Sequence, residues 1–163
     1  MTVKVGLVGY GTIGKRVADA VALQKDMKLV GITAHTYNYK MELAKRKGFS
    51  IYSMDGVEDF EKNGIEIAGS VTNLFDDVDI VVDCTPRKIG LENKQNYYLP
   101  KKLKAIFQGG EKASTADVSF VAQCNYDKAI DKDFIRVVSC NTTGLCRTLD
   151  PIHKEFGIDS VHA

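Results

Sequence analysis

The sequence predicts an α/β fold, in which helices cover both faces of a doubly wound, mostly parallel β-sheet. Three observations predict it. Strand patterns alternate with helix patterns along the chain, a glycine-rich turn joins the first strand to the first helix, and residues 78–84 form an almost wholly apolar strand. Strands that are apolar on both faces are typical of parallel sheets buried between helices.

The composition is that of a globular domain. The 163 residues are 44% hydrophobic and 26% charged, and 22 basic against 21 acidic side chains give a net charge of +1. Such a balance does not favour nucleic-acid or membrane-surface binding, and we expect neither partner. The N-terminus lacks a signal-peptide pattern, and no apolar run reaches the roughly 18 residues of a spanning helix. We therefore expect a cytoplasmic protein.

Cysteine usage favours reduced thiols over a metal site. Cys84, Cys124, Cys140 and Cys146 have no CxxC spacing, and only three histidines accompany them. We expect no metal, because structural zinc sites are built from closely spaced Cys and His ligands. Three of the four cysteines are expected to be buried structural residues, the usual fate of this residue type, and Cys140 is the exception argued below.

The first elements form a βαβ unit. Residues 3–8 have a strand pattern and are followed by a glycine turn at residues 9–14. The apolar positions from Ile13 to Val21 predict a helix, and residues 27–33 predict a second strand. Further helices are expected at 39–47, 57–63, 74–77 and 90–99, and further strands at 49–52, 65–68, 78–84, 103–107 and 135–139.

The last helix is expected at 141–156. Leu145, Leu149, Ile152 and Phe156 fall on one stripe of it, and Pro151 is expected to bend or shorten it. Residues 158–163 have the pattern of a further strand at its beginning, which predicts that the chain is a fragment, with a native tail as the alternative.

The glycine turn has the Rossmann dinucleotide-binding pattern. Gly9-Tyr10-Gly11-Thr12-Ile13-Gly14 follows a strand and opens a helix, which is the context that this motif requires. Its glycines allow a close approach of a pyrophosphate, whose charge is favoured by the free N–H groups of the helix start. The alternative is a tight turn that binds no ligand.

The end of the second strand bears on the choice of cofactor. Thr33-Ala34-His35-Thr36 has no carboxylate of the kind that favours NAD by binding the ribose hydroxyls. Both NADP and NAD are therefore admissible. His35 is either a phosphate contact or an exposed loop residue, and the loop interpretation is slightly favoured.

A second site is predicted where a strand passes into the last helix. In Ser139-Cys140-Asn141-Thr142-Thr143-Gly144 the thiol lies at a helix N-terminus, which favours its thiolate. The Asn141 amide and free N–H groups could hold an oxyanion, and Thr142 and Thr143 suit a phosphate. The alternative is a structural cysteine.

Two loops complete the predicted cleft. Asp83-Cys84-Thr85-Pro86 ends the central strand at its carboxyl edge, where ligands bind in such sheets. Gln108-Gly109-Gly110-Glu111-Lys112 follows another strand and either borders the cofactor or forms a simple turn.

Taken together, these segments resemble the archaeal-type glyceraldehyde-3-phosphate dehydrogenases. Four stretches carry the resemblance, which covers essentially the whole chain: residues 9–20, residues 83–86, residues 107–112 and residues 136–147. The last stretch is the most specific, whereas the first is shared with many dehydrogenases.

The resemblance implies an NAD(P)-dependent enzyme that oxidises glyceraldehyde 3-phosphate with inorganic phosphate. Cys140 would be the nucleophile and Asn141 would help to hold the oxyanion, with Thr142 and Thr143 near the phosphate sites. The dinucleotide would contact the following residues: Gly9, Tyr10, Gly11, Thr12, Ile13, Gly14, Ala34, His35, Thr85, Pro86, Gln108 and Gly109. The family has a Lys-Thr pair after the second strand where this chain has Ala34-His35, and Arg87-Lys88 after Pro86 is a second departure.

The resemblance also implies a division of the chain. Residues 1–139 would be the dinucleotide-binding domain, and residues 140–163 the nucleophile helix and the start of a truncated catalytic domain. The continuation in the family supplies the base histidine and phosphate-binding arginines, and His153 and His162 do not match that base. A homotetramer is implied at full length. Two alternative functions remain open. One is a non-catalytic dinucleotide-binding sensor, and the other is a semialdehyde dehydrogenase, which the Gln108–Glu111 match disfavours.

Overall fold

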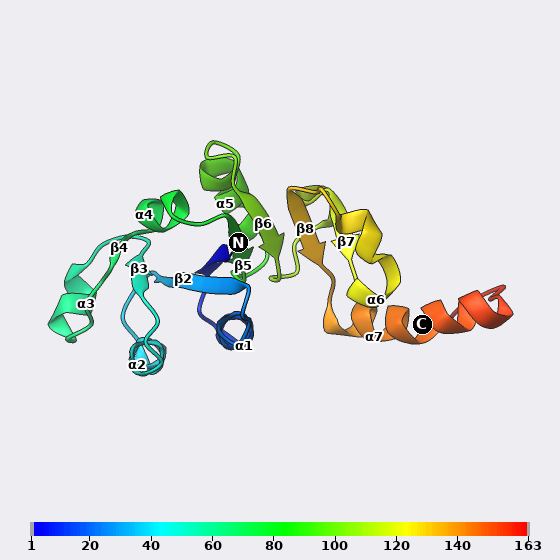
Figure 1. Cartoon of the computed structure of the whole chain (residues 1–163), viewed down its shortest axis with the longest axis horizontal. Coiled ribbons are helices and arrows are strands. Elements are labelled where there is room, and N and C mark those ends of the chain that lie inside the picture. The colour runs from blue at the N-terminus through cyan, green and yellow to red at the C-terminus, as the bar shows by residue number, and fades with distance from the viewer. Residues whose placement is uncertain (1, 163) are drawn as a thin grey trace.

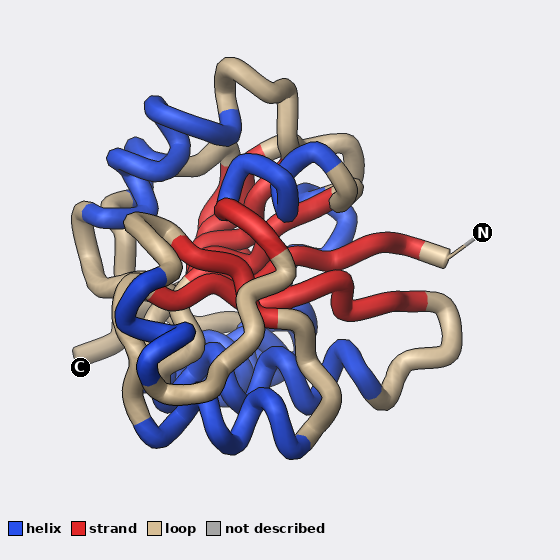
Figure 2. Tube along the Cα trace, turned by 90° about the vertical axis from the view of Figure 1, so that its left-hand side faces the viewer, coloured by secondary structure: helices blue, strands red, loops and turns tan. Residues whose placement is uncertain are grey.

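The computed structural model describes residues 2–162 and has an eight-stranded sheet at its centre (Figure 1). The strand order is β4-β3-β2-β1-β5-β6-β8-β7, and every neighbouring pair is parallel. Helices lie on both sides of the sheet (Figure 2). The predicted doubly wound α/β fold is therefore confirmed.

The strands are short apart from the first two. Their bounds are β1 Val3–Val8, β2 Met27–Ala34, β3 Ile51–Ser53, β4 Gly69–Ser70, β5 Ile80–Asp83, β6 Lys104–Phe107, β7 Val118–Phe120 and β8 Phe134–Val137. The α-helices are α1 Thr12–Ala22, α2 Tyr39–Arg46, α3 Glu58–Lys62, α4 Val71–Asp76, α5 Ile89–Asn93, α6 Ala122–Asn125 and α7 Cys140–Phe156. A π-helix, η1 Lys94–Tyr98, continues α5, and η2 Ala113–Thr115 and η3 Tyr126–Ala129 are 3₁₀ turns.

The strand order creates a crevice at the carboxyl ends of β1 and β5. The chain builds β2, β3 and β4 on one side of β1 and then returns to place β5 on the other side. Ligands of open α/β sheets bind outside the strand ends at such a switch point.

Two apolar layers fix the sheet between its helices. Val82 packs in the cluster that contains Leu7, Ile32 and Phe60, whereas its neighbour Val81 packs in the cluster on the opposite face. Successive side chains of a strand point to opposite faces, so a central strand must be apolar throughout to fill both layers. This is the physical reason for the apolar run that the sequence shows at 78–84.

Several predicted elements need correction at the sheet edges. The strand expected at 65–68 is wrong, because β4 comprises Gly69 and Ser70, which pair with Tyr52 and Ser53. The N–H of Ile65 is instead used to close α3, donating to the Phe60 carbonyl at 3.0 Å. Strand β7 and helix α6 were not predicted, since three or four residues show no measurable periodicity.

The C-terminal segment also differs from the prediction. Helix α7 continues through Pro151 to Phe156, so the proline does not shorten it, and the predicted bend stays a prediction. Proline has no N–H, so it cannot donate the usual hydrogen bond to the Arg147 carbonyl. No strand forms within residues 158–162, because they pair with none of the described strands, and residue 163 lies outside the described residues. Within residues 2–162, no helix is both long enough and apolar enough to cross a bilayer.

The π-helix joins α5 to the centre of the sheet through a buried carboxylate. Asp83 Oδ2 accepts hydrogen bonds from Asn93 Nδ2 at 2.9 Å and from the Tyr98 hydroxyl at 2.7 Å. Asn93 and Tyr98 are five positions apart, a spacing that an α-helix would place on different faces. The wider π-turn brings both side chains to the same oxygen, a placement typical of π-turns near functional sites.

These buried groups predict a loss of stability in alkali. Burial and then the neighbouring Asp83 charge raise the pKa of Cys84 from 9.0 to about 12 and that of Tyr98 well above 10.0. Both groups therefore lose protons more readily in the unfolded chain. Their stabilising contribution is complete below pH 9 and falls as the pH rises from 9 toward 12.

Urea unfolding at pH 8 to 11 measures this effect. The free energy of unfolding should fall less steeply with pH in Cys84→Ala and in Tyr98→Phe than in the wild type. Tyr126→Phe, a change at an exposed tyrosine, is the matched control and should leave the slope unchanged. Equal slopes in all four proteins would contradict the assignment.

Candidate functional site

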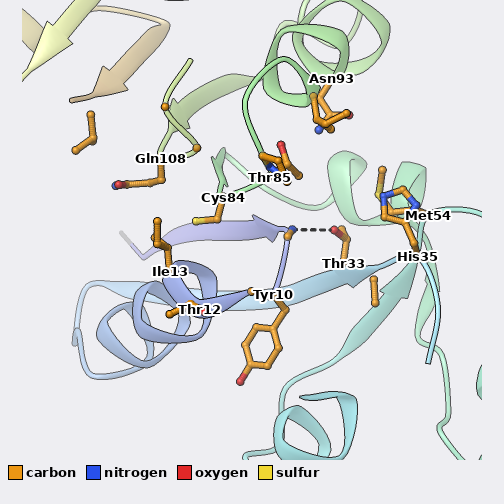
Figure 3. A pocket seen from close by; sticks show the side chains of 18 of the residues that line it. Tyr10, Thr12, Ile13, Thr33, His35, Met54, Cys84, Thr85, Asn93 and Gln108 are labelled. Atoms are coloured by element: carbon orange, nitrogen blue, oxygen red, sulfur yellow. Dashed lines mark hydrogen bonds between the residues drawn. The ribbon is translucent and has the colours of Figure 1, made fainter. Parts of the chain in front are cut away.

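A large cleft opens at the switch point of the sheet. Its volume is about 1360 Å³, and it is bordered by the glycine turn, the end of β2, the loops after β5 and β6, and the start of α7. Figure 3 shows the side of this cleft between Thr12 and Ile13 of the glycine turn and the loops that carry Thr85 and Gln108. Segments that are far apart in the sequence thus meet in one hollow.

The three glycines of the turn have different structural roles. Gly9 has a φ of +87°, and a Cβ there would lie 3.0 Å from Thr85 N. A Cβ on Gly14 would lie 2.1 Å from the Gly9 carbonyl oxygen, so Gly14 lets α1 pack on the turn and does not line the cleft. A Cβ on Gly11 would have nothing within 4 Å. Gly11 therefore leaves open the space that a ligand at this turn would occupy.

The start of α1 can receive an anion. Gly11 is its N-cap and makes no side-chain cap bond, and the first turn contains no acidic residue. The first N–H groups of a helix have no partner within it, and the helix dipole adds positive potential there. A phosphate group fits this position.

Tyr10 contributes its backbone to the turn but not its ring. The side chain is 5% exposed, packs in the core cluster beneath the turn, and meets Phe49 edge-on with ring centroids 6.4 Å apart. In Figure 3 the ring points away from Thr85 and Gln108. Among the described residues, its hydroxyl is the buried side-chain polar atom that lacks a hydrogen-bond partner.

The end of β2 is fixed to the glycine turn. Gly9 N donates to Thr33 Oγ1 at 3.3 Å, and Ala34 is buried with 8% exposure. His35 is exposed and borders the cleft, and its Nδ1 lies 2.7 Å from Asp55 Oδ2. The two interpretations of His35 are thus both retained: it is an exposed loop residue that also faces the cleft.

Asp83 positions the loop that follows β5. Its Oδ1 accepts hydrogen bonds from the backbone N–H of Thr85, at 2.9 Å, and from the Thr85 hydroxyl. Its carbonyl accepts from Gln108 N at 2.7 Å, and a Cβ on Gly109 would lie 1.7 Å from the Thr85 carbonyl oxygen. The two loops are therefore in direct contact, and glycine is required at 109.

Glu111 is a buried residue whose position sequence reasoning missed. Its Oε1 accepts from Gly90 N at 3.1 Å, and Arg136 Nη1 donates to its carbonyl at 2.8 Å. This carboxylate ties the loop after β6 to the start of α5. A glutamate in a polar loop carries no sequence feature that predicts burial.

Cys140 lies at the edge of the cleft in the first turn of α7. Ser139 is the N-cap, and its hydroxyl accepts from Thr142 N at 3.2 Å. Cys140, Thr143, Gly144 and Arg147 line the cleft, whereas Asn141 and Thr142 do not. The Cys140 thiol lies 3.9 Å from Asn141 Oδ1. The oxyanion role of Asn141 and the phosphate role of Thr142 stay predictions.

The environment of Cys140 differs from that of the other cysteines. Cys140 is exposed, whereas the other three are partly covered. Burial raises the pKa of Cys84 to about 12. Desolvation and then the Asp150 charge also raise the pKa of Cys124. Within residues 2–162, no three His, Cys, Asp or Glu side chains are grouped so that they could hold a metal ion.

Comparison with known proteins gives one family match. Residues 3–123 match the family model described as dihydrodipicolinate reductase, N-terminus. Several solved structures share the fold, at sequence identities too low to show more. One is the aspartate semialdehyde dehydrogenase with NADP from Candida albicans, which has a TM-score of 0.63 and 16% identity over 97% of this chain and 48% of that one. Another is an NAD-binding protein from Listeria innocua, which has a TM-score of 0.51 and 19% identity over 87% of this chain and 36% of that one.

Curated relatives are much more similar in sequence. Glyceraldehyde-3-phosphate dehydrogenases from Methanococcoides burtonii, Archaeoglobus fulgidus and Methanothermus fervidus are 55%, 52% and 50% identical to this chain over 96%, 100% and 98% of it. The chain covers 47% to 48% of these relatives, so it spans about half of their length. The predicted resemblance to the archaeal enzymes is confirmed.

Proposed function

The chain belongs to the family described as dihydrodipicolinate reductase, N-terminus, and we propose that it is the dinucleotide-binding, nucleophile-bearing half of a phosphorylating glyceraldehyde-3-phosphate dehydrogenase. One observation carries the proposal: the glycine turn and the exposed thiol of Cys140 line the same cleft. The 50% to 55% identity to enzymes of that name over nearly the whole chain supports it.

The cleft residues fit a nicotinamide dinucleotide. The open space at Gly11 and the uncapped start of α1 suit a pyrophosphate. Thr85 and Pro86 would flank the dinucleotide, and Gln108 and Gly109 would lie toward its nicotinamide ribose. Thr12, Ile13, Ala34 and His35 complete the proposed contacts. NAD(P)⁺, when bound, supplies the hydride acceptor of the reaction.

Cys140 supplies the nucleophile in this proposal. Its thiolate attacks the aldehyde carbon and forms a C–S bond, and the former carbonyl oxygen takes the negative charge. Loss of hydride from the same carbon oxidises it to a thioester. An oxygen of inorganic phosphate then attacks, the C–S bond breaks, and 1,3-bisphosphoglycerate leaves with the thiolate restored. Free N–H groups at the α7 start favour the negatively charged states.

The remaining parts of the proposal concern the whole enzyme. Residues 1–139 would form the cofactor domain, and residues 140–163 would begin the catalytic domain. Glyceraldehyde 3-phosphate and inorganic phosphate would be its substrates, and a homotetramer its assembly. The base implied by the family resemblance is not His153 or His162, so it would come from sequence that aligns with the other half of the relatives.

A chimera tests the proposal. Residues 1–163 are joined to the second half of the Methanococcoides burtonii relative, replacing its own first half. The chimera should form NAD(P)H from glyceraldehyde 3-phosphate only when phosphate is present. The 163-residue chain alone should not, because general-base catalysis commonly contributes about 10²–10⁴-fold.

Variants of the chimera separate this function from that of a non-catalytic sensor module. Cys140→Ala should abolish turnover and keep dinucleotide binding. Cys146→Ala, on the same helix, is the control and should stay active. A folded, dinucleotide-binding chimera without turnover would favour the sensor function.

A further inference from the structure

The end of β2 lacks the carboxylate that usually binds the adenosine ribose hydroxyls. A carboxylate from the loop after β3, that of Asp55, lies at this end of the cleft instead. His35 and Asp55 both border the cleft, and their side chains meet at 2.7 Å. Asp55 lies two residues beyond the end of β3, and His35 lies one residue beyond the end of β2. The sheet therefore places an acidic side chain where the sequence of β2 itself provides none.

The backbone around Asp55 is held in place. Ala34 pairs with Ser53 in the parallel ladder, and Met54 N donates to the Ala34 carbonyl at 2.9 Å, one step beyond the strands. The Ser53 hydroxyl accepts from Gly56 N at 3.0 Å and donates to the Gly56 carbonyl, so it closes a turn over Asp55. Asp55 is thus fixed by strand pairing, by this turn and by its contact with His35.

Asp55 lies at the end of the cleft where the adenosine ribose of a bound dinucleotide would be expected. Figure 3 shows His35 and Met54 together, on the side of the cleft away from Gln108. In dinucleotide-binding sheets the pyrophosphate lies over the glycine turn and the adenosine ribose over the end of β2. The carboxylate of Asp55 borders that end, whereas Cys140 belongs to the wall formed by α7.

We propose that Asp55 is a residue that determines cofactor specificity: its carboxylate accepts hydrogen bonds from the adenosine ribose hydroxyls of NAD and disfavours the 2′-phosphate of NADP. This inference rests on the proposed dinucleotide binding. A monoester phosphate carries a charge of about −1.5 to −2 near pH 7, so a neighbouring carboxylate repels it. His35 holds the carboxylate, and Lys40, which also lines the cleft, is left to attract the phosphate once Asp55 is neutral.

Calorimetric titration of NAD⁺ and NADP⁺ into the 163-residue chain tests this. In Asp55→Asn the ratio of the two dissociation constants should shift toward NADP by about fivefold, the scale of one exposed charge interaction. Asp55 is exposed, so the variant should fold. The shift should shrink at high ionic strength, because salt screens exposed charges.

Two further variants serve as controls. Glu61→Gln removes an exposed charge on α3 away from the cleft, and His35→Ala breaks the pair but keeps the carboxylate. Neither should shift the ratio toward NADP. An unchanged ratio in Asp55→Asn, or an equal shift in either control, would overturn the inference while leaving dinucleotide binding intact. A wild type that binds neither dinucleotide would overturn the proposed function, and this inference with it.

Discussion

Replacing Gly11 with Val is expected to weaken dinucleotide binding at least about 100-fold while the fold is kept. The backbone at Gly11 is extended, with a φ of −85° and a ψ of −156°, so no left-handed conformation requires glycine at this position. Nothing in the protein lies within 4 Å of a Cβ there, so the branched side chain meets only the space proposed for the pyrophosphate. Losing a close phosphate contact and its hydrogen bonds removes several kcal/mol, and about 2.8 kcal/mol corresponds to 100-fold.

Gly14→Ala is the matched control at the other end of the turn. Its added Cβ would lie 2.1 Å from the Gly9 carbonyl oxygen, so α1 must move and stability must fall. Calorimetry for binding and urea unfolding for stability separate the two variants. Gly11→Val should lose binding with only a small loss of stability, because valine is a poorer helix N-cap than glycine. Gly14→Ala should lose much more stability. A Gly11→Val protein with wild-type affinity would show that the dinucleotide does not lie over this turn.

Cys140 is expected to react with limiting iodoacetamide at neutral pH at least about 10³ times faster than Cys84. A thiol with a pKa of about 12 is ionised in about one molecule in 10⁵ at pH 7, and the thiolate is the nucleophile. Cys124 is also expected to react more slowly, because desolvation and the Asp150 charge raise its pKa. Cys140 is exposed and lies in the first turn of a 17-residue helix.

Peptide mass spectrometry after brief labelling measures the distribution. Most of the label should be on Cys140, and Cys140→Ser should remove it without raising the label on Cys84. Urea-unfolded protein is the control, in which all four cysteines should react at similar rates. Faster labelling of Cys124 or Cys146 in the folded chain would remove the physical support for Cys140 as nucleophile.

The sequence allowed the centre of the fold to be predicted better than its edges. The second halves of β1 and β2 and most of β5 are buried between the two apolar layers, so most of their residues are apolar, and this pattern is visible without a structure. Strand β4 has two residues and β7 three, and such short edge strands depend on their neighbours rather than on their own pattern. Residues 158–162 have a strand-like pattern but pair with none of the described strands.

The candidate site shows the same division between local and tertiary information. The glycine turn is predictable because the geometry of a tight turn is local. Helix periodicity explains why Asn141 and Thr142 do not line the cleft. Residues three, four and seven positions after Cys140 lie on the same helix face as Cys140, whereas the residues one and two positions after it do not. Asp55 and Glu111 could not be predicted, since their positions depend on strand pairing and on loop contacts between distant segments.

A titration of the ¹⁵N-labelled chain with NAD⁺, followed by amide NMR shifts, tests most directly the claim that one cleft joins the dinucleotide turn to Cys140. At 18.0 kDa the chain suits residue-by-residue measurement. Shifts are expected in four cleft segments and in Cys140, all fitting one dissociation constant. The four segments are residues 9–13, 33–36, 84–85 and 108–110. Amides of β7 and the far end of α7 should not move. Shifts in the glycine turn without any at Cys140, or shifts concentrated outside the cleft, would contradict the claim.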